Sequence, residues 1–214
     1  MEPVLLEDFN VQVDPSEVKR LLGHREDEHA AASERLDGII ADSLQVAEGL
    51  IAPKGIYTVT AGCDLPGSTI FEKLERVAFC VCTIGPALER EVSVLTGRGD
   101  LLYAVVLDTV GSAAAEAVAE YIDGKIQEEA GREGLKTSCR ASPGYGDWDL
   151  REQAGIFQLL PADRIGITLT ESFMMVPRKS VSFAIHIAER PARMRSENSC
   201  RNCDRVDCPY RLLA

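Results

Sequence analysis

The chain of 214 residues has a net charge of −11, which argues against nucleic acid and anionic membranes as partners because both require a basic surface. Hydrophobic residues make up 45% and charged residues 27%, a composition typical of a soluble globular protein with a conventional core. The acidic N-terminus lacks the features of a secretory signal, and no apolar run approaches the ~20 residues of a membrane helix, so we expect a cytoplasmic protein without a membrane partner.

Proline and aspartate residues mark the element boundaries in the first half of the chain. Asp14 followed by Pro15 predicts the N-terminus of a short helix, and Pro53 ends a longer helix in which apolar residues recur every three or four positions. Gly85 and Pro86 separate a strand from the next helix. The expected elements are an extended segment, a short helix, a longer helix, two strands and a third helix, over residues 4–13, 15–23, 26–51, 55–61, 76–84 and 87–95.

The second half contains the longest predicted helix. Gly97 and Gly99 predict a break, after which we expect a segment over residues 101–110 and then a separate helix, capped by Ser112 and ending near Ala130. The apolar residues of this helix fall on one side. The opposite side carries polar residues that helical periodicity assigns to solvent, namely Glu116, Glu120, Asp123 and Gln127.

The last part of the chain predicts two more strands. We expect a partly helical segment over residues 149–160, followed by strands over residues 165–170 and 181–187. In the last strand an aliphatic row alternates with a row that includes Ser182 and His186. His186 is therefore predicted to be a surface residue on the face opposite the aliphatic row.

The hexapeptide Arg140-Ala-Ser-Pro-Gly-Tyr145 places two turn formers between an arginine and a tyrosine. The guanidinium fork of Arg140 can pair with a carboxylate, and Gly144 allows a ligand to approach the backbone closely. These residues fit a small-molecule clamp, although such a hexapeptide by itself is more often an ordinary surface turn. Trp148, the only tryptophan, either lines a pocket here or anchors the loop to the core, which is the commoner role.

Three motifs in a fixed order make the pattern more specific. A helical run over residues 113–121 precedes Arg140-x-x-x-Gly144-Tyr145, and the block of residues 169–182, which begins Leu-Thr-Glu-Ser, follows it. This order resembles the activation domain of vitamin B12-dependent methionine synthase, most clearly over residues 83–187. The resemblance implies an α+β fold with a twisted, mainly antiparallel sheet flanked by helices. We expect this domain over residues 1–188, followed by a linker and a cysteine-rich tail over residues 189–214.

The resemblance also implies a binding site for S-adenosylmethionine. In this assignment Arg140 holds the carboxylate of the ligand, Glu116 holds its amino group, and Tyr145 lines the methyl pocket as the catalytic residue. Gly146 stands where the large enzymes of the family usually have proline. The complete set of implied ligand-binding residues is Glu116, Arg140, Ala141, Ser142, Gly144 and Tyr145.

The function implied by the resemblance is reactivation of a corrinoid cofactor. One-electron reduction of oxidised cobalt to cob(I)alamin is unfavourable. Methyl transfer from S-adenosylmethionine consumes the cob(I)alamin and so makes the overall reaction favourable, and this transfer needs no general base. The chain shows no homocysteine, folate or cobalamin module, and no histidine lies in the Asp-x-His-x-x-Gly pattern of a cobalt ligand. We therefore expect action in trans on cobalamin that a partner methyltransferase, such as methionine synthase, holds and this chain does not retain.

Two other functions fit the same residues. The chain could be a non-catalytic S-adenosylmethionine-binding subunit that holds a corrinoid enzyme in one conformation. It could instead be a reductive activator that works through a metal centre in the tail, with or without a separate electron donor protein.

The cysteines divide into a dispersed set and a tail cluster. Cys80 and Cys82 lie in a predicted strand and are expected to be small buried residues. The tail spacing, Cys-x-x-Cys followed by a cysteine five residues later, suits either zinc or an iron-sulfur cluster, and free thiols in a flexible C-terminus are an equal alternative. Because three thiolates are one ligand short, Cys63 or Cys139 could complete the site. The candidate metal ligands in the tail are Cys200, Cys203 and Cys208.

Overall fold

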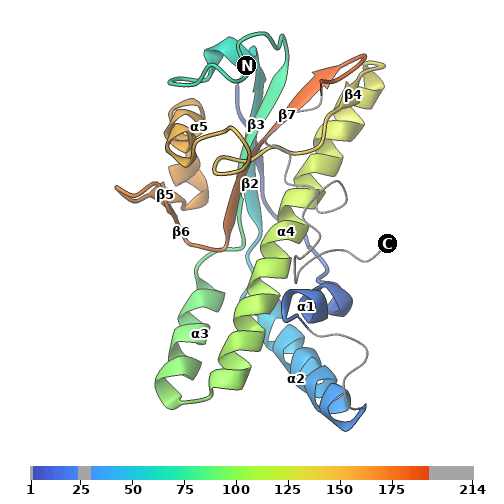
Figure 1. Ribbon diagram of the computed structural model, residues 1–214, viewed down its shortest axis with the longest axis vertical. Coiled ribbons are helices and arrows are strands. Elements are labelled where there is room, and N and C mark those ends of the chain that lie inside the picture. Colours follow the sequence, from blue (N-terminus) through green and yellow to red (C-terminus); the bar gives the residue numbers. More distant parts are fainter. Residues whose placement is uncertain (1, 24–29, 193–214) are drawn as a thin grey trace.

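The computed structural model describes residues 2–23 and 30–192, which form a five-stranded sheet and a separate two-stranded hairpin (Figure 1). All the strand pairs between these elements are antiparallel, which confirms the predicted α+β architecture. The strands of the sheet, in spatial order, are β1 (Val4–Leu6), β2 (Lys54–Thr60), β3 (Val77–Thr83), β7 (Ser180–Ala188) and β4 (Lys136–Thr137). The hairpin pairs β5 (Thr168–Leu169) with β6 (Met175–Val176).

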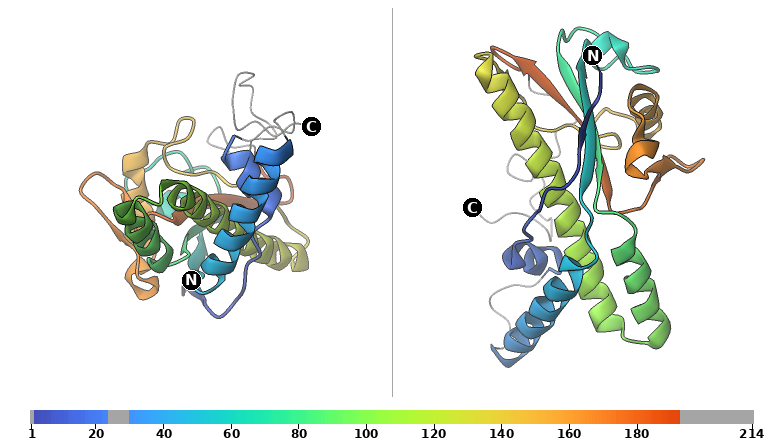
Figure 2. Two further views of the ribbon diagram at one scale, coloured as in Figure 1. Left: turned by 90° about the horizontal axis from the view of Figure 1, so that it is seen from below. Right: turned by 180° about the vertical axis from the view of Figure 1, so that it is seen from behind.

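Helices cover both faces of the sheet (Figures 1 and 2). The longest helix, α4 (Leu101–Arg132), crosses one face and packs against α1, α2 and α3. The opposite face is covered by α5 and by short 3-10 turns. The bounds of the remaining helices are α1 Pro15–Leu21, α2 Ala30–Glu48, α3 Ala87–Arg98 and α5 Gln153–Leu159, and those of the 3-10 turns are η1 Gly62–Asp64, η2 Leu150–Glu152 and η3 Ala162–Ile165.

Most predicted boundaries in the first half agree with the structure to within a few residues, although only Val4–Leu6 of the extended segment is a strand. The predicted start of the second helix, at residues 26–29, lies outside the described residues. Asp14 is the N-cap of α1, and its carboxylate accepts a hydrogen bond from the Ser16 amide at 2.8 Å, while Pro15 occupies the first turn. Gly99 adopts a φ of 86° at the end of α3, a left-handed conformation that glycine tolerates without strain. The chain therefore reverses direction between α3 and α4 where the glycines predicted a break.

The prediction of a second break near Ser112 was wrong, because α4 is a single helix. Ser112 lies inside it and donates a hydrogen bond to the Asp108 carbonyl oxygen at 3.3 Å. The adjacent Gly111 serves helix packing, since a Cβ atom at this position would lie 2.6 Å from Leu88 on α3. Small residues here let the two helices approach closely rather than ending α4.

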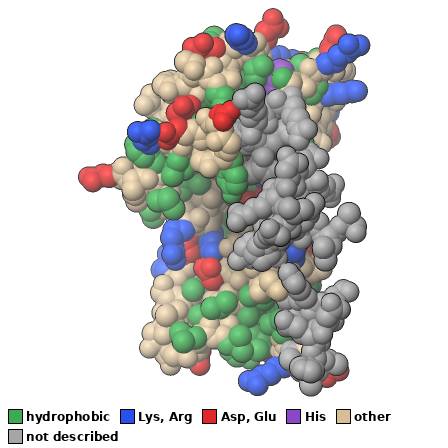
Figure 3. Space-filling model, in the orientation of Figure 1, with side chains coloured by type: hydrophobic (Ala, Val, Ile, Leu, Met, Phe, Trp, Pro, Cys, Tyr) green, Lys and Arg blue, Asp and Glu red, His purple; other side chains and the backbone are tan. Residues whose placement is uncertain are grey.

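α4 is also long and apolar enough to cross a membrane, contrary to the prediction that the chain has no such run. Half of its most apolar segment is buried. The core helix of a soluble protein can be equally long and apolar, so these properties are weak evidence for a membrane span. The exposed part includes Leu101, Leu102 and Val105. Figure 3 shows hydrophobic side chains gathered at this end of the molecule, where α3 and α4 meet.

The sheet separates two hydrophobic cores. Every residue of β3 is buried, and its side chains alternate between the faces. Cys80 and Cys82 face the core beneath α4, whereas Val77 and Phe79 face the core beneath α5. The prediction that the two cysteines are small buried residues is confirmed, since both are at most 1% exposed.

The polar row of β7 is buried, and the prediction that His186 is a surface residue was wrong. His186 is 8% exposed and pairs in register with Val77, so it lies on the face covered by the α5 layer. Its Nδ1 atom accepts a hydrogen bond from the Ala192 amide at 2.9 Å. In the same row, the Ser182 hydroxyl donates to Gln153 Oε1 at 2.6 Å.

The predicted strand over residues 165–170 is mostly not a strand. Ile165 is the last residue of η3, and Gly166 ends that turn with a φ of 77°. Only Thr168–Leu169 pairs, in the hairpin with β6. The hairpin turn contains Phe173, whose positive φ of 62° is unusual for a residue with a side chain. The Phe173 carbonyl accepts a hydrogen bond from buried Gln153 at 2.8 Å, which ties the turn to α5.

Candidate functional site

The segment that follows α4 is fixed to the edge of the sheet by its backbone. Ala141 forms an isolated β-bridge with Ala184 of β7. The Ala141 amide donates to the Ala184 carbonyl at 2.9 Å, and the Ala184 amide donates to the Ala141 carbonyl at 2.8 Å. Two residues further along β7, the His186 carbonyl accepts a hydrogen bond from the Ser138 amide. Arg140 and Ser142, on either side of the bridge, therefore have defined positions relative to β7 and α4.

The turn that begins at Ser142 is closed by backbone hydrogen bonds. The Gly144 amide donates to the Trp148 carbonyl at 2.7 Å, and Gly144 adopts a φ of 89° that favours glycine. Trp148 is 1% exposed and packs edge to face against Phe71, with ring centroids 4.7 Å apart. Of its two predicted roles, the structure shows the anchor, because Trp148 does not line the neighbouring pocket.

A pocket of about 320 Å³ opens beside this turn. Three of the residues predicted for the ligand site line it, from α4 and from the turn: Glu116, Ser142 and Tyr145. Tyr145 is 54% exposed. Arg140, Ala141 and Gly144 are not part of the lining. The full lining is Glu116, Ser142, Pro143, Tyr145, Leu150, Gln153, Phe173, Met174, Met175, Arg178, Ser180, Val181 and Ser182.

Much of this lining comes from the 169–182 block. The sequence marked the block as part of the family pattern but did not assign its residues to the pocket. Phe173 and Met174 reach the pocket because the β5–β6 hairpin turns there, and Gln153 reaches it from α5. The motif Leu-Thr-Glu-Ser was the available signal, and it identified the segment without identifying the residues that face inward.

Arg140 reaches the pocket wall through an ion pair. Its Nη2 donates to Glu116 Oε2 at 3.1 Å, and its Nε lies 3.8 Å from Asp123 Oδ2. The guanidinium carbon lies 5.6 Å from the centre of the Phe183 ring, within the range of a cation–π interaction. The prediction that Asp123 is solvated was wrong, because it is 16% exposed and burial raises the pKa of its carboxyl.

A second group of charges ties three elements together below the pocket. Lys179 is 12% exposed, and its Nζ lies 2.9 Å from the Asp108 carboxylate and 2.8 Å from the Ser112 hydroxyl, both on α4. Its backbone amide donates to Glu89 on α3 at 2.6 Å. Arg178, which lines the pocket, also pairs with Glu89 at 3.5 Å. These contacts fix the start of β7 against the α3–α4 hairpin.

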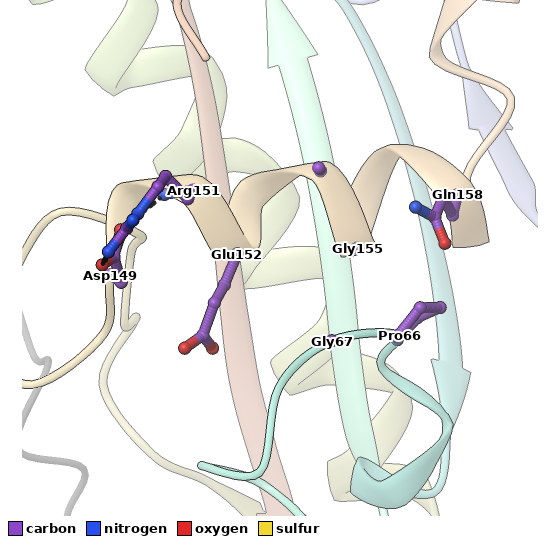
Figure 4. A pocket seen from close by; sticks show the side chains of 8 residues that line it. Pro66, Gly67, Asp149, Arg151, Glu152, Gly155 and Gln158 are labelled. Atoms are coloured by element: carbon purple, nitrogen blue, oxygen red, sulfur yellow. Dashed lines mark hydrogen bonds and ion pairs between the residues drawn. The ribbon is translucent and has the colours of Figure 1, made fainter. Parts of the chain in front are cut away.

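A second pocket, of about 330 Å³, lies on the other side of the η2–α5 segment (Figure 4). Figure 4 shows Glu152 pointing toward the loop at Gly67, and its Oε2 is buried with no hydrogen-bond partner among the described residues. Asp149 and Arg151 pair with each other, and the hydrogen bonds from Arg151 lower the pKa of Asp149 to about 2. None of the predicted ligand-binding residues lines this pocket, so we place the candidate site in the first.

The predicted metal site cannot be placed in the same way. Cys200, Cys203 and Cys208 lie outside the described residues. Cys63 and Cys139 are exposed free thiols. Within residues 2–23 and 30–192, no three His, Cys, Asp or Glu side chains are grouped so that they could hold a metal ion.

Two comparisons with known proteins agree with this architecture. The family model described as "Vitamin B12 dependent methionine synthase, activation domain" matches residues 71–194, more than half of the chain. A solved structure, the crystal structure of the MetH reactivation domain bound to AdoHcy, matches with a TM-score of 0.64 at 17% identity, covering 93% of this chain and 80% of that chain. At this identity the structural likeness shows a shared fold.

Proposed function

Because the chain belongs to the family of vitamin B12-dependent methionine synthase activation domains, we propose that it binds S-adenosylmethionine in the pocket beside the turn at 142–148. The observation that carries this proposal is the convergence of the Arg140 guanidinium and the Glu116 carboxylate at the pocket wall. The related MetH domain bound to AdoHcy supports it, since that ligand carries the same adenosyl and amino acid groups. The bound ligand would then serve reactivation of a corrinoid cofactor.

The described side chains suit the chemistry of this ligand. Its amino acid end carries one cation and one anion, which match the carboxylate of Glu116 and the guanidinium of Arg140. The rest of the pocket combines apolar residues such as Phe173 and Met174 with hydroxyl and amide groups, among them Ser142. A volume of about 320 Å³ is within the ~300–1,000 Å³ of small-molecule pockets.

Methyl transfer from this site requires orientation more than acid–base chemistry. When bound, S-adenosylmethionine supplies an activated methyl group on a sulfonium, which needs no general base. The protein would hold the amino acid end through Arg140 and Glu116, and so fix the position of the methyl group for in-line attack. Tyr145, which is exposed and lines the pocket, would lie along the path between the methyl group and an acceptor.

We propose that the acceptor is a corrinoid carried by a methyltransferase partner outside these 214 residues. His186, the histidine of the described region, is buried, and its Nδ1 accepts a hydrogen bond from the Ala192 amide. It is therefore unsuited to ligate cobalt at the pocket. Its position supports the view that the corrinoid and its lower ligand come from elsewhere, as a cytoplasmic methionine synthase or a related corrinoid enzyme would provide.

Calorimetric titration with S-adenosylmethionine tests the site. We expect Arg140→Ala to weaken binding by about 1.5 to 3 kcal/mol, the range for hydrogen bonds to charged groups. Arg151→Ala is the matched control, since this arginine is 74% exposed and pairs with Asp149 outside the pocket. Equal affinities of the wild type and Arg140→Ala would refute the role of Arg140, and a wild type that does not bind would refute the proposed ligand.

A transfer assay separates the catalytic function from a purely binding one. The protein is mixed with methyl-labelled S-adenosylmethionine and a reduced corrinoid protein, and label on the corrinoid is counted. We expect transfer that depends on this chain and falls in Tyr145→Ala. Binding without transfer would favour the alternative of a non-catalytic S-adenosylmethionine-binding subunit.

A further inference from the structure

Arg140 is paired with two carboxylates that α4 presents on one side. Glu116 and Asp123 are seven residues apart, about two helical turns, so their side chains project in nearly the same direction. Glu116 pairs with Nη2 of the guanidinium and Asp123 lies beside Nε. The two acids therefore contact different nitrogen atoms of the same arginine.

The surroundings of these two carboxylates are very different. The Glu116 side chain is 51% exposed and lines the pocket, so it can exchange one partner for another at little cost. The Asp123 side chain is 16% exposed, does not line the pocket, and accepts a hydrogen bond from Gln127 at 2.8 Å. Asp123 is thus the fixed contact of Arg140, and Glu116 is the replaceable one.

The third nitrogen of the guanidinium has no partner in the part of the chain that the structure describes. Arg140 Nη1 is buried, and no described residue accepts a hydrogen bond from it. A buried donor without an acceptor is unfavourable, so this atom retains unused capacity for a ligand. A carboxylate binds an arginine most strongly through two parallel hydrogen bonds. With Nε beside Asp123, the edge left for such a contact is the one formed by Nη1 and Nη2, once Glu116 has withdrawn.

We propose that Asp123 is a positioning residue that holds Arg140 by its Nε side while the ligand replaces Glu116 on the Nη side. The ligand carboxylate takes Nη1 and Nη2, and the released Glu116 carboxylate takes the ligand ammonium. Only a ligand that carries both a carboxylate and an ammonium group can make this exchange without leaving Arg140 or Glu116 unpaired. This inference rests on the proposed function, and adds a residue and an order of contacts to it.

The test compares two ligands on the intact chain by calorimetry. One is S-adenosylmethionine, and the other is decarboxylated S-adenosylmethionine, which has the amine but no carboxylate. We expect the wild type to prefer the first ligand. In Asp123→Asn the affinity for S-adenosylmethionine should fall about tenfold, the order of a direct coupling between neighbouring charged groups. The affinity for the decarboxylated ligand should change by less than about twofold, because that ligand does not use Arg140.

Glu120→Gln is the matched control. Glu120 is an exposed acid on the same helix near Asp123, and no ion pair joins it to Arg140, so its removal should leave both affinities unchanged. If Asp123→Asn lowers the affinity for both ligands equally, Asp123 has a structural role only and the proposal is overturned. The proposal is also overturned if neither affinity falls. A wild type that binds neither ligand would instead overturn the proposed function. If Asp123→Asn does not fold, Gln127→Ala, which loosens Asp123, should show a smaller loss for the same ligand alone, and unchanged affinities there would overturn the proposal.

Discussion

The two faces of the sheet are covered in different ways. On one face, the aliphatic row of β7 and the cysteines of β3 pack under α4, a regular helix whose buried residues are mostly alanine, valine, leucine and isoleucine. On the other face, the polar row of β7 lies under short turns and the small helix α5. The polar side chains of this row have individual partners, as Ser182 has in Gln153 and His186 has in the Ala192 amide.

The difference bears directly on the pocket, which draws its walls from both layers. Glu116 comes from α4, while Gln153 and Phe173 come from the α5 layer. We expect a regular helix held by apolar packing to tolerate small changes in shape. The hydrophobic free energy depends on the apolar area that is buried and not on the direction of individual contacts. Turns held by particular hydrogen bonds and close backbone contacts tolerate it poorly. We therefore expect the pocket to depend more on the α5 layer than on the α4 layer.

The largest expected effect comes from truncating one core residue in each layer. Trp148→Ala should destabilise the protein by about 3 to 5 kcal/mol, and Leu107→Ala, in the α4 core, by about 2 to 5 kcal/mol. Both residues are 1% exposed. Only Trp148→Ala should also weaken S-adenosylmethionine binding, because Trp148 anchors the turn that carries Ser142 and Tyr145. Denaturant unfolding and calorimetric titration measure the two effects.

This comparison can fail in a definite way. If Trp148→Ala is destabilised but binds with the affinity of the wild type under conditions where it is folded, the turn does not need its anchor. If Leu107→Ala loses binding to the same degree, the two layers do not differ in their influence on the pocket.

A smaller effect is expected from adding a methyl group to a glycine in each layer. In α5, a Cβ atom at Gly155 would lie 2.3 Å from the Pro66 carbonyl oxygen, so backbone must move. In α4, a Cβ atom at Gly124 would meet nothing within 4 Å. We expect Gly155→Ala to cost about 1 to 3 kcal/mol through overpacking. Gly124→Ala should stabilise the protein by up to about 1 kcal/mol through helix propensity.

Thermal unfolding of the two variants decides this point. Opposite shifts of the melting temperature relative to the wild type would support the contrast between the crowded position of Gly155 and the open position of Gly124. Destabilisation of Gly124→Ala by as much as Gly155→Ala would contradict it, because nothing in the structure opposes a side chain at position 124.

The same contrast explains which parts of the fold the sequence predicts. The α4 layer and the central strands follow from apolar periodicity and from the breaks at Asp14, Pro86 and Gly99, except that the sequence also predicted a break at Ser112, inside α4. The errors lie where a contact distant in sequence decides burial. Periodicity assigned Asp123 to solvent, but its side chain is only 16% exposed and lies beside Arg140 from a later loop. Strand alternation separated the two rows of β7 but could not show that the polar row is also covered.

The candidate site was predictable in part for the same reason. The hexapeptide at Arg140 is a local signal, and its pairing with Glu116 was accessible only through the family resemblance. The hairpin residue Phe173 and the α5 residue Gln153 gave no local signal, because their position in the pocket depends on a turn with a positive φ and on a long-range hydrogen bond. The irregular layer thus supplies the residues that sequence patterns miss.

The smallest expected effect is a pH dependence that arises from the polar row. Burial lowers the pKa of His186 below the ordinary value of 6.5, and its Nδ1 must stay unprotonated to accept the hydrogen bond from Ala192. The unfolded state therefore binds a proton at higher pH than the folded state. As pH falls below about 6.5 and through the lowered pKa, the free energy of unfolding should decrease, and above 6.5 this contribution should be constant.

His186→Asn isolates this contribution, since an asparagine carbonyl can accept the same hydrogen bond but does not titrate. The measurement is the free energy of unfolding by denaturant at several pH values from 7.5 to about 5, where most carboxyl groups stay ionised. We expect the wild type to lose stability relative to His186→Asn as the pH falls, with His24 and His29 contributing equally to both proteins. Parallel curves would mean that His186 is protonated as easily in the folded state as in the unfolded state, and that this part of the polar row is open to water. A difference confined to low pH would show that the α5 layer keeps the His186 side chain neutral against the sheet.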